Sequence, residues 1–186
     1  MKGLLQFLLA ALPLVFAADV FSQKIEYPER FQNLLSQAGI EFFEPVEGSY
    51  RDVQVPENQF QNCDFAIRSN KEDLQIRFCI LPWNESDPLS MNPHVATGRM
   101  VAAVATNVEI GLISRIQPDP ESLRKDFNAD WGMEYFFQPK PGFSEKLDCR
   151  MVALHKEGKG TAFIFYLFDD PGNEALDVRY LALKFQ

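Results

Sequence analysis

The most informative pattern of hydrophobic positions lies in residues 161–168, which read Thr-Ala-Phe-Ile-Phe-Tyr-Leu-Phe. Successive side chains of a β-strand point to opposite faces, so a strand with one exposed face alternates between apolar and polar residues. This segment is apolar at odd and even positions alike, which predicts a strand covered on both faces. Residues 149–154 and 180–185 show the same character more weakly. The sheet that contains them therefore needs a covering layer on each side.

Other segments supply the helices and the remaining strands. Apolar residues at i, i+3, i+4 and i+7 predict a helix over residues 28–39, closed by Gly39. Asn92 and the proline after it start a second helix that runs to about residue 108, and a third, shorter helix is expected at residues 119–131. The predicted strands are residues 40–43, 63–68, 74–80, 111–116, 133–137, 149–156, 161–168 and 178–185.

Together these elements predict an α+β protein built as a three-layer α/β/α sandwich with a mainly antiparallel central sheet. Glycine-bearing connections such as residues 157–160 join neighbouring strands as hairpins, and hairpin strands are antiparallel. Because the sheet needs cover on both faces, we expect the helices to supply both outer layers. The chain of 186 residues fits one domain, and no repeat or linker divides residues 23–186.

The first residues are typical of a secretory signal peptide. Lys2 supplies the positive charge, residues 4–16 form the apolar stretch, and Ala17 is a small residue near the expected cleavage position. Cleavage as late as Ser22 also fits. The apolar stretch is shorter than the roughly 20 residues of a spanning helix, which makes a membrane anchor the weaker alternative. We therefore expect a signal peptide at residues 1–17 and a secreted or periplasmic protein with no membrane span after cleavage.

Export implies an oxidising compartment, so the pairing of the three cysteines matters. When the alternation of strands 63–68 and 74–80 is matched, Cys63 shares a face with Phe65, and Cys79 points to the opposite face. A disulfide cannot close between opposite faces of a sheet. This favours three buried thiols at Cys63, Cys79 and Cys149. The alternative is one disulfide and one thiol.

The charge and composition of the chain indicate which kinds of binding partner to expect. The chain has 18 lysines and arginines against 26 acidic residues, a formal net charge of −8, and no basic cluster. Nucleic-acid binding rests on clustered positive charge, so we expect no nucleic-acid partner. The 17 phenylalanines indicate a bulky, well-filled core.

Residues with catalytic potential are few. Only His94 and His155 could act as a histidine base, and no Gly-x-Ser-x-Gly motif marks a nucleophile. His94 falls in the first turn of the second helix, where packing or capping is its simpler role. His155 ends a strand, and we expect it at the rim of the sheet. Metal-ligand spacings and phosphate-binding glycine motifs are absent from the sequence, so we predict neither a metal nor a cofactor.

Two tryptophan-bearing segments are candidate binding sites. Trp83, Glu85 and Asp87 lie in a polar connecting loop, and recognition residues are common in such loops. Asp130 and Trp131 come at the end of the third predicted helix. The alternative for Trp131 is a packing contact that closes this helix.

The predicted architecture and order of elements resemble the superfamily of PsbP-like photosystem extrinsic proteins and Mog-type Ran-binding factors. Three segments carry the likeness: residues 39–45, which read Gly-Ile-Glu-Phe-Phe-Glu-Pro; the hairpin at residues 63–80; and the strand pair around residues 158–160, Gly-Lys-Gly. Members of that superfamily are mostly small binding or accessory proteins without a known catalytic centre. The resemblance therefore implies an α/β/α sandwich and a non-enzymatic role, and it transfers no site residue.

These observations favour an exported accessory or binding protein of the periplasm or cell envelope. It would have no catalytic centre and would contact a protein partner through its surface. Two alternatives stay open. One is an exported hydrolase that uses His94 or His155, and the other is a carrier of a small apolar ligand held between the sheet and the helices.

Overall fold

The computed structural model describes residues 25–55, 57, 61–107 and 111–186. The signal peptide that we predict at residues 1–17, with cleavage as late as residue 22, lies outside this part of the chain. The second predicted helix, expected to run to about residue 108, is wrong at its end: the helix stops at Val104, because Ala105 is extended and forms a β-bridge with Pro139.

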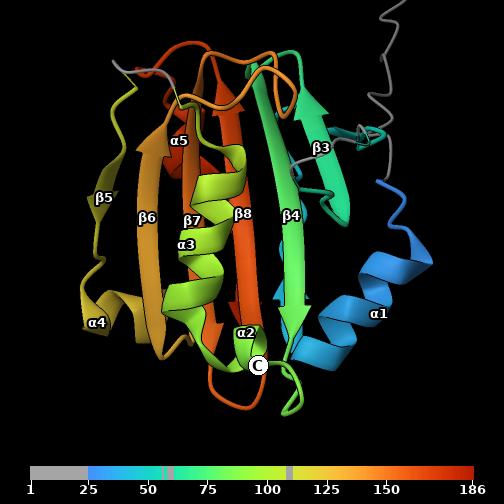
Figure 1. Cartoon of the computed structure of the whole chain (residues 1–186). Helices are drawn as coiled ribbons and strands as arrows, with labels where there is room; N and C mark the ends of the chain where they lie inside the picture. Colours follow the sequence, from blue (N-terminus) through green and yellow to red (C-terminus); the bar gives the residue numbers. More distant parts are fainter. Residues whose placement is uncertain (1–24, 56, 58–60, 108–110) are drawn as a thin grey trace, which may run out of the picture.

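Short helices and longer strands alternate along the described chain (Figure 1). The helices are α1 (Glu29–Ala38), α2 (Pro88–Met91), α3 (Pro93–Val104), α4 (Pro120–Ser122), the π-helical turn η1 (Leu123–Phe127) and α5 (Ala175–Val178). The strands are β1 (Ile40–Phe42), β2 (Arg51–Asp52), β3 (Phe65–Ser69), β4 (Leu74–Pro82), β5 (Ser114–Ile116), β6 (Trp131–Phe137), β7 (Asp148–Lys156), β8 (Gly160–Phe168) and β9 (Leu183–Phe185).

The two longest helices begin and end for local reasons that the sequence shows. Helix α1 ends at Gly39, whose φ of +56° is a left-handed conformation that glycine adopts at little cost. Helix α3 begins after Asn92, whose side chain accepts a hydrogen bond from the backbone N–H of Val95 at 3.2 Å. Pro93 occupies its first turn, where no backbone donor is needed. Both predicted starts and the Gly39 cap are confirmed.

Seven strands form one antiparallel sheet in the order β2-β3-β4-β8-β7-β6-β5. Figure 1 shows the strands from β3 to β5 side by side, with α3 lying in front of the sheet. The two strands nearest the ends of the described chain, β1 and β9, pair with each other as a separate two-stranded antiparallel sheet. Short turns join β3 to β4 and β7 to β8, while β4 and β8 are brought together from distant parts of the chain.

Strand β8 lies in the middle of the large sheet, between β4 and β7, and all nine of its residues are buried. Phe163 and Ile164 point to opposite faces, and their exposed fractions are 2% and 0%. The predicted two-sided cover of this strand is therefore confirmed.

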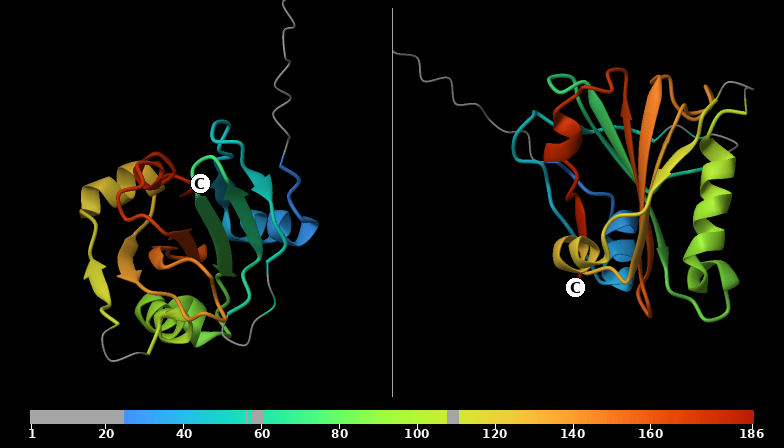
Figure 2. Two further views of the ribbon diagram at one scale, coloured as in Figure 1. Left: turned by 90° about the horizontal axis from the view of Figure 1, so that it is seen from above. Right: turned by 90° about the vertical axis from the view of Figure 1, so that its left-hand side faces the viewer.

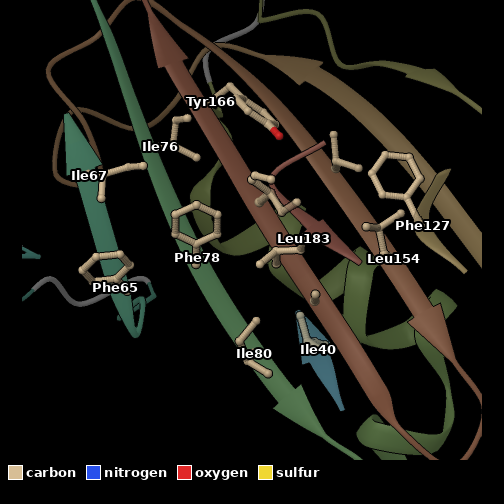
Figure 3. Packing of buried hydrophobic residues seen from close by; sticks show 14 of the residues in the cluster. Ile40, Phe65, Ile67, Ile76, Phe78, Ile80, Phe127, Leu154, Tyr166 and Leu183 are labelled. Carbon is tan, nitrogen blue, oxygen red and sulfur yellow. The ribbon is translucent and has the colours of Figure 1, made fainter. Parts of the chain in front are cut away.

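The two faces of the large sheet are covered by different kinds of structure (Figure 2). On one face, α3 and Phe143 of the connection between β6 and β7 pack over residues such as Met151 and Phe165. On the other face, α1, η1, α5 and the small β1–β9 sheet enclose a second apolar cluster. Figure 3 shows Ile40 of β1 and Leu183 of β9 against Phe78 and Leu154 of the large sheet.

The predicted three-layer α/β/α sandwich is wrong. The structure has two sheets with nine described strands, and its helices are few and short, so the fold is β-rich. The reasoning failed because a strand that is apolar on both faces requires cover and does not specify what provides it. Part of that cover is the β1–β9 sheet, which joins segments about 140 residues apart, a pairing that strand composition does not reveal.

The predicted strand at residues 178–185 is also wrong in its first half. Helix α5 ends at Val178, and only Leu183–Phe185 pairs as β9. The hydroxyl of Tyr166 shares its one proton between the backbone oxygens of Arg179 and Tyr180, which lie 3.0 and 2.9 Å away. These bonds use backbone acceptors that a strand would need for its ladder, so the segment runs as a loop over the sheet.

Candidate functional site

Both tryptophans and both histidines lie at one end of the large sheet, as an aromatic cluster of Trp83, His94, Trp131 and His155. Trp131 and His155 are directly opposite each other on β6 and β7. The ring of His155 lies 6.1 Å from that of Trp83, just after β4, and the ring of His94, in the first turn of α3, lies 4.8 Å from that of Trp131. The four side chains come from different elements, so only the folded chain assembles them.

Backbone hydrogen bonds hold the loops of the aromatic cluster together. The N–H of Trp83 donates to the carbonyl oxygen of Lys159 at 3.0 Å, and the N–H of Asp130 donates to that of His155 at 2.8 Å. The Asp130 carboxylate accepts a hydrogen bond from the N–H of Glu157 at 2.9 Å. Asp130 therefore fastens the turn between β7 and β8 to the start of β6.

The five predicted binding residues separate into two groups. Trp83, Asp130 and Trp131 meet at the aromatic cluster. Asp87 instead caps α2, because its carboxylate accepts a hydrogen bond from a backbone N–H in the first turn of that helix at 3.0 Å. Glu85 is exposed in the loop between. No contact of Glu85 with the aromatic cluster occurs within the described residues.

The surroundings of the two histidines argue against the hydrolase alternative. The Nδ1 of His155 lies 2.9 Å from the hydroxyl oxygen of Thr161, and the two residues are only 6% and 0% exposed. Both side chains of this pair are buried, although His155 lies near a strand end as expected. His94 is exposed and its ring packs edge-to-face on Trp131. Neither arrangement presents an accessible nucleophile beside its base.

The burial of His155 predicts a pH dependence of stability. Burial lowers the pKa of its imidazole below the usual 6.5, and this effect outweighs nearby Asp130 and Glu157, which raise the pKa. As the pH falls through about 6.5, the unfolded chain takes up this proton first, so the folded state loses stability. We expect the free energy of unfolding in urea to fall between about pH 7.5 and about pH 5.5.

The matched control is the His155→Asn variant, which cannot titrate in this range. Its free energy of unfolding should fall less than that of the wild type over the same interval. Parallel pH profiles of the two proteins would contradict the assignment to His155.

A buried arginine that the sequence analysis did not single out lies on the α3 face of the sheet. Arg77 of β4 is 3% exposed, and its guanidinium donates hydrogen bonds to the carbonyl oxygen of Phe143 at 2.7 Å and to the Gln75 side chain at 3.3 Å. The guanidinium carbon lies 4.9 Å from the centre of the Phe143 ring. Its Nε has no hydrogen-bond partner, and no carboxylate forms an ion pair with it among the described residues.

This isolated charge is the least expected feature of the interior. Burial lowers the pKa of the Arg77 guanidinium, but arginine keeps its proton in proteins. A buried charge normally has an opposite charge beside it, since removal from water costs several kcal/mol per ion. Neutral acceptors and one aromatic ring compensate this cost only in part.

Arg77 lines a cavity with a volume of about 600 Å³. Arg68 and Lys146 also line this Arg77 cavity, against the carboxylates of Glu145 and Asp169. Lys146 is already held by Asp169, at 2.7 Å, and by Asp73. The two arginines therefore supply the positive charge that is available to a ligand, and the cavity is suited to an anionic group.

The sequence around Arg77 does not distinguish it from an ordinary surface arginine. In residues 74–80, Leu-Gln-Ile-Arg-Phe-Cys-Ile, the polar positions alternate with apolar ones, which indicates an ordinary half-exposed strand. In the structure, Phe143 and the connection between β6 and β7 cover this face. The arginine is buried by a segment 66 positions away, so no local pattern could reveal its isolation.

A second opening lies on the opposite face of the sheet. This apolar groove has a volume of about 340 Å³, and its floor includes the buried side chains of Ile76 and Phe78. Large apolar side chains that are 40–82% exposed stand along it: Phe43, Val46, Val178 and Leu181. Exposed apolar groups gathered around a groove are typical of a binding surface.

Comparison of the chain with protein-family models, curated proteins and solved structures found no match in any of the three. The resemblance to the PsbP-like and Mog-type superfamily therefore stays a prediction. The structure by itself shows a β-rich fold in which a buried arginine without an acidic partner lines a polar cavity.

Two further properties concern the described residues alone. Within residues 25–55, 57, 61–107 and 111–186, every helix is too short or too polar to cross a bilayer. The same residues contain no group of three or more histidine, cysteine, aspartate or glutamate side chains placed to hold a metal ion.

Proposed function

We propose that this protein is an exported binding protein without a catalytic centre, which takes a carboxylate group of a partner protein into the Arg77 cavity. The apolar segment at residues 4–16 supports export. One observation carries the binding role: a buried guanidinium with no carboxylate partner lines a cavity of about 600 Å³.

A ligand carboxylate would supply the partner that Arg77 lacks. Arginine presents donors in a planar fork that matches the two oxygens of a carboxylate, and such charge-assisted hydrogen bonds are stronger than neutral ones. The burial of the Arg77 guanidinium strengthens the attraction further. The net charge of −8 disfavours a broadly acidic partner surface, so the cavity is suited to one inserted acidic side chain.

The test compares two ligands that have the same shape and differ in charge. We expect N-acetylglutamate to bind at least about ten-fold more tightly than N-acetylglutamine in calorimetric titrations, because a hydrogen bond to a charged group contributes about 1.5–3 kcal/mol. The Arg77→Gln variant should lose this difference, since glutamine can still donate to the Phe143 carbonyl but carries no charge.

Two further variants serve as controls. Arg77→Lys keeps the charge without the planar fork, so it should bind more weakly and still prefer the acid. Arg68→Gln removes an exposed charge from the same cavity and should change affinity by only about two-fold. Equal binding of acid and amide by the wild type, or unchanged binding by a folded Arg77→Gln variant, would contradict the proposed function.

The apolar groove supports a second candidate, a carrier of a small apolar ligand. Its exposed rim of Phe43, Val46, Val178 and Leu181 favours this function. Native mass spectrometry of protein purified from its source separates the two candidates. An added mass of lipid size indicates the carrier, whereas the carboxylate-binding function predicts the mass of the chain alone or bound to a partner protein.

A further inference from the structure

Cys63 and Cys79 are in direct contact, contrary to the facing that the sequence pattern indicated. Their sulfur atoms lie 2.7 Å apart, and both side chains are buried on the α3 face. The cause is a bend at Asp64, just before β3. There the Asp64 carboxylate accepts a hydrogen bond from the N–H of Ile80 at 2.8 Å. The strand ladder ends at this point, and Cys63 turns to the face that carries Cys79.

The third cysteine is too far away to compete. Cys149 of β7 aligns with Leu167 of β8, and Leu167 aligns with Gln75 of β4. Cys149 is therefore two strands and four residues along β4 from Cys79, with neighbouring strands about 4.8 Å apart and residues about 3.3 Å apart. A disulfide joins Cα atoms within about 7 Å, so Cys149 can reach neither of the other two.

We propose that Cys63 and Cys79 form an intramolecular disulfide in an oxidising compartment and that Cys149 stays a thiol. The oxidant is a disulfide compound such as oxidised glutathione. One cysteine thiolate attacks it and releases the first thiol, and the second cysteine then attacks the mixed disulfide and releases the other thiol. Two protons leave the protein, two electrons pass to the oxidant, and one S–S bond forms.

The burial of Cys63 and Cys79 determines at which stage the disulfide can form. Burial raises the pKa of the Cys79 thiol, which keeps its reactive thiolate scarce in the folded protein. A cavity of about 390 Å³, lined by Cys79, Asn62 and Asp64, opens beside it. We therefore expect the bond to form mainly during folding, when both thiols are exposed.

The bond would join the start of β3 to β4 across 16 positions of the chain. These strands support Arg77, which is two residues from Cys79 on the same face of the sheet. A covalent link there would restrict the unfolded chain and so raise the thermal midpoint Tm. Reduction of the refolded protein should lower Tm by roughly 5–10 °C.

The experiment counts thiols in the full chain after refolding with oxidised glutathione. The protein is then denatured without reductant and alkylated, and its peptides are analysed by mass spectrometry. We expect one alkylated thiol, at Cys149, and a peptide linked through Cys63 and Cys79. The variants Cys63→Ser and Cys79→Ser should each leave two thiols. Cys149→Ser is the matched control and should leave none while keeping the fall in Tm on reduction.

Three thiols in the refolded wild type, or a link that includes Cys149, would overturn the proposal. Protein purified from its source provides a separate test, because the bond in vivo rests on the proposed export. One thiol in that protein supports both the pairing and the export. Three thiols in it, with the bond still forming in vitro, would contradict export and leave the pairing and the carboxylate-binding site unaffected.

Discussion

Replacing Glu134 by alanine is expected to lower the free energy of unfolding by about 3–5 kcal/mol. Glu134 of β6 is 6% exposed, and its carboxylate accepts hydrogen bonds from Arg150 at 2.8–2.9 Å and from the hydroxyl of Tyr180. Without it, the Arg150 guanidinium stays largely buried, beside the rings of Tyr180 and Phe136, 4.4 and 5.6 Å away, and the exposed Asp177. A buried charge that loses its partner costs much more than the pair gains by forming. Urea denaturation measures the loss.

The same network contains its own controls. Asp177 also pairs with Arg150, at 3.4 Å, but its side chain is 92% exposed, so Asp177→Ala should cost less than about 1 kcal/mol. The double variant Glu134→Leu, Arg150→Met removes both charges and should be more stable than Glu134→Ala. A double variant as unstable as the single one would show that the loss comes from packing and not from the unpaired charge.

Replacing Gly160 by alanine should destabilise the protein by about 3–5 kcal/mol, for two reasons that add. The φ of Gly160 is +124°, a conformation that residues with a Cβ adopt only under strain. A Cβ at this position would also press against the carbonyl oxygen of Leu81 and lie 2.8 Å from the backbone nitrogen of Trp83. Backbone atoms of a paired strand cannot move aside as a flexible side chain can.

The control for Gly160→Ala lies two residues away. Gly158 also has a positive φ, +71°, but a Cβ there would meet no atom within 4 Å. Gly158→Ala should therefore cost only about 1–2 kcal/mol, from backbone strain alone. Urea denaturation of both variants isolates the steric part, and tryptophan fluorescence reports whether Trp83 has moved. Equal losses in the two variants would contradict the role of the close approach.

The cysteines show why strand patterns assign faces correctly only while the ladder continues. The alternation of β4 was predicted correctly, since Arg77 and Cys79 share the α3 face. The face of Cys63 was wrong, because the bend at Asp64 interrupts the ladder one residue before the regular pairing starts. A single irregular residue reverses the face of everything beyond it, and no composition rule places that residue. None of the three cysteines is bonded in the structure, but the opposite facing of Cys63 and Cys79, on which the expected free thiols rested, was wrong.

Some residues of the candidate sites could be selected from the sequence, and others only from the structure. Trp83 was selected in a loop, and Asp130 and Trp131 at the end of the third predicted helix. That helix ends earlier, at Phe127, and Trp131 begins β6, but the structure does bring the three residues together. It also adds His94 and His155 to them, which the sequence had placed in unrelated elements. The Arg77 cavity was missed because its walls come from β3, β4 and the connection between β6 and β7, and the isolation of a charge depends on every neighbour.

The sequence alone determined most of the segments that become regular structure and that β8 is covered on both faces, because backbone propensity, capping and two-sided apolarity are local properties. Only the tertiary structure decided what covers the sheet, that Cys63 contacts Cys79, and that Arg77 is buried without an acidic partner. Those outcomes depend on contacts between residues far apart in the chain, such as β1 with β9 and Arg77 with Phe143. The free energy of such contacts depends on the whole surroundings of each group, which no short window of sequence contains.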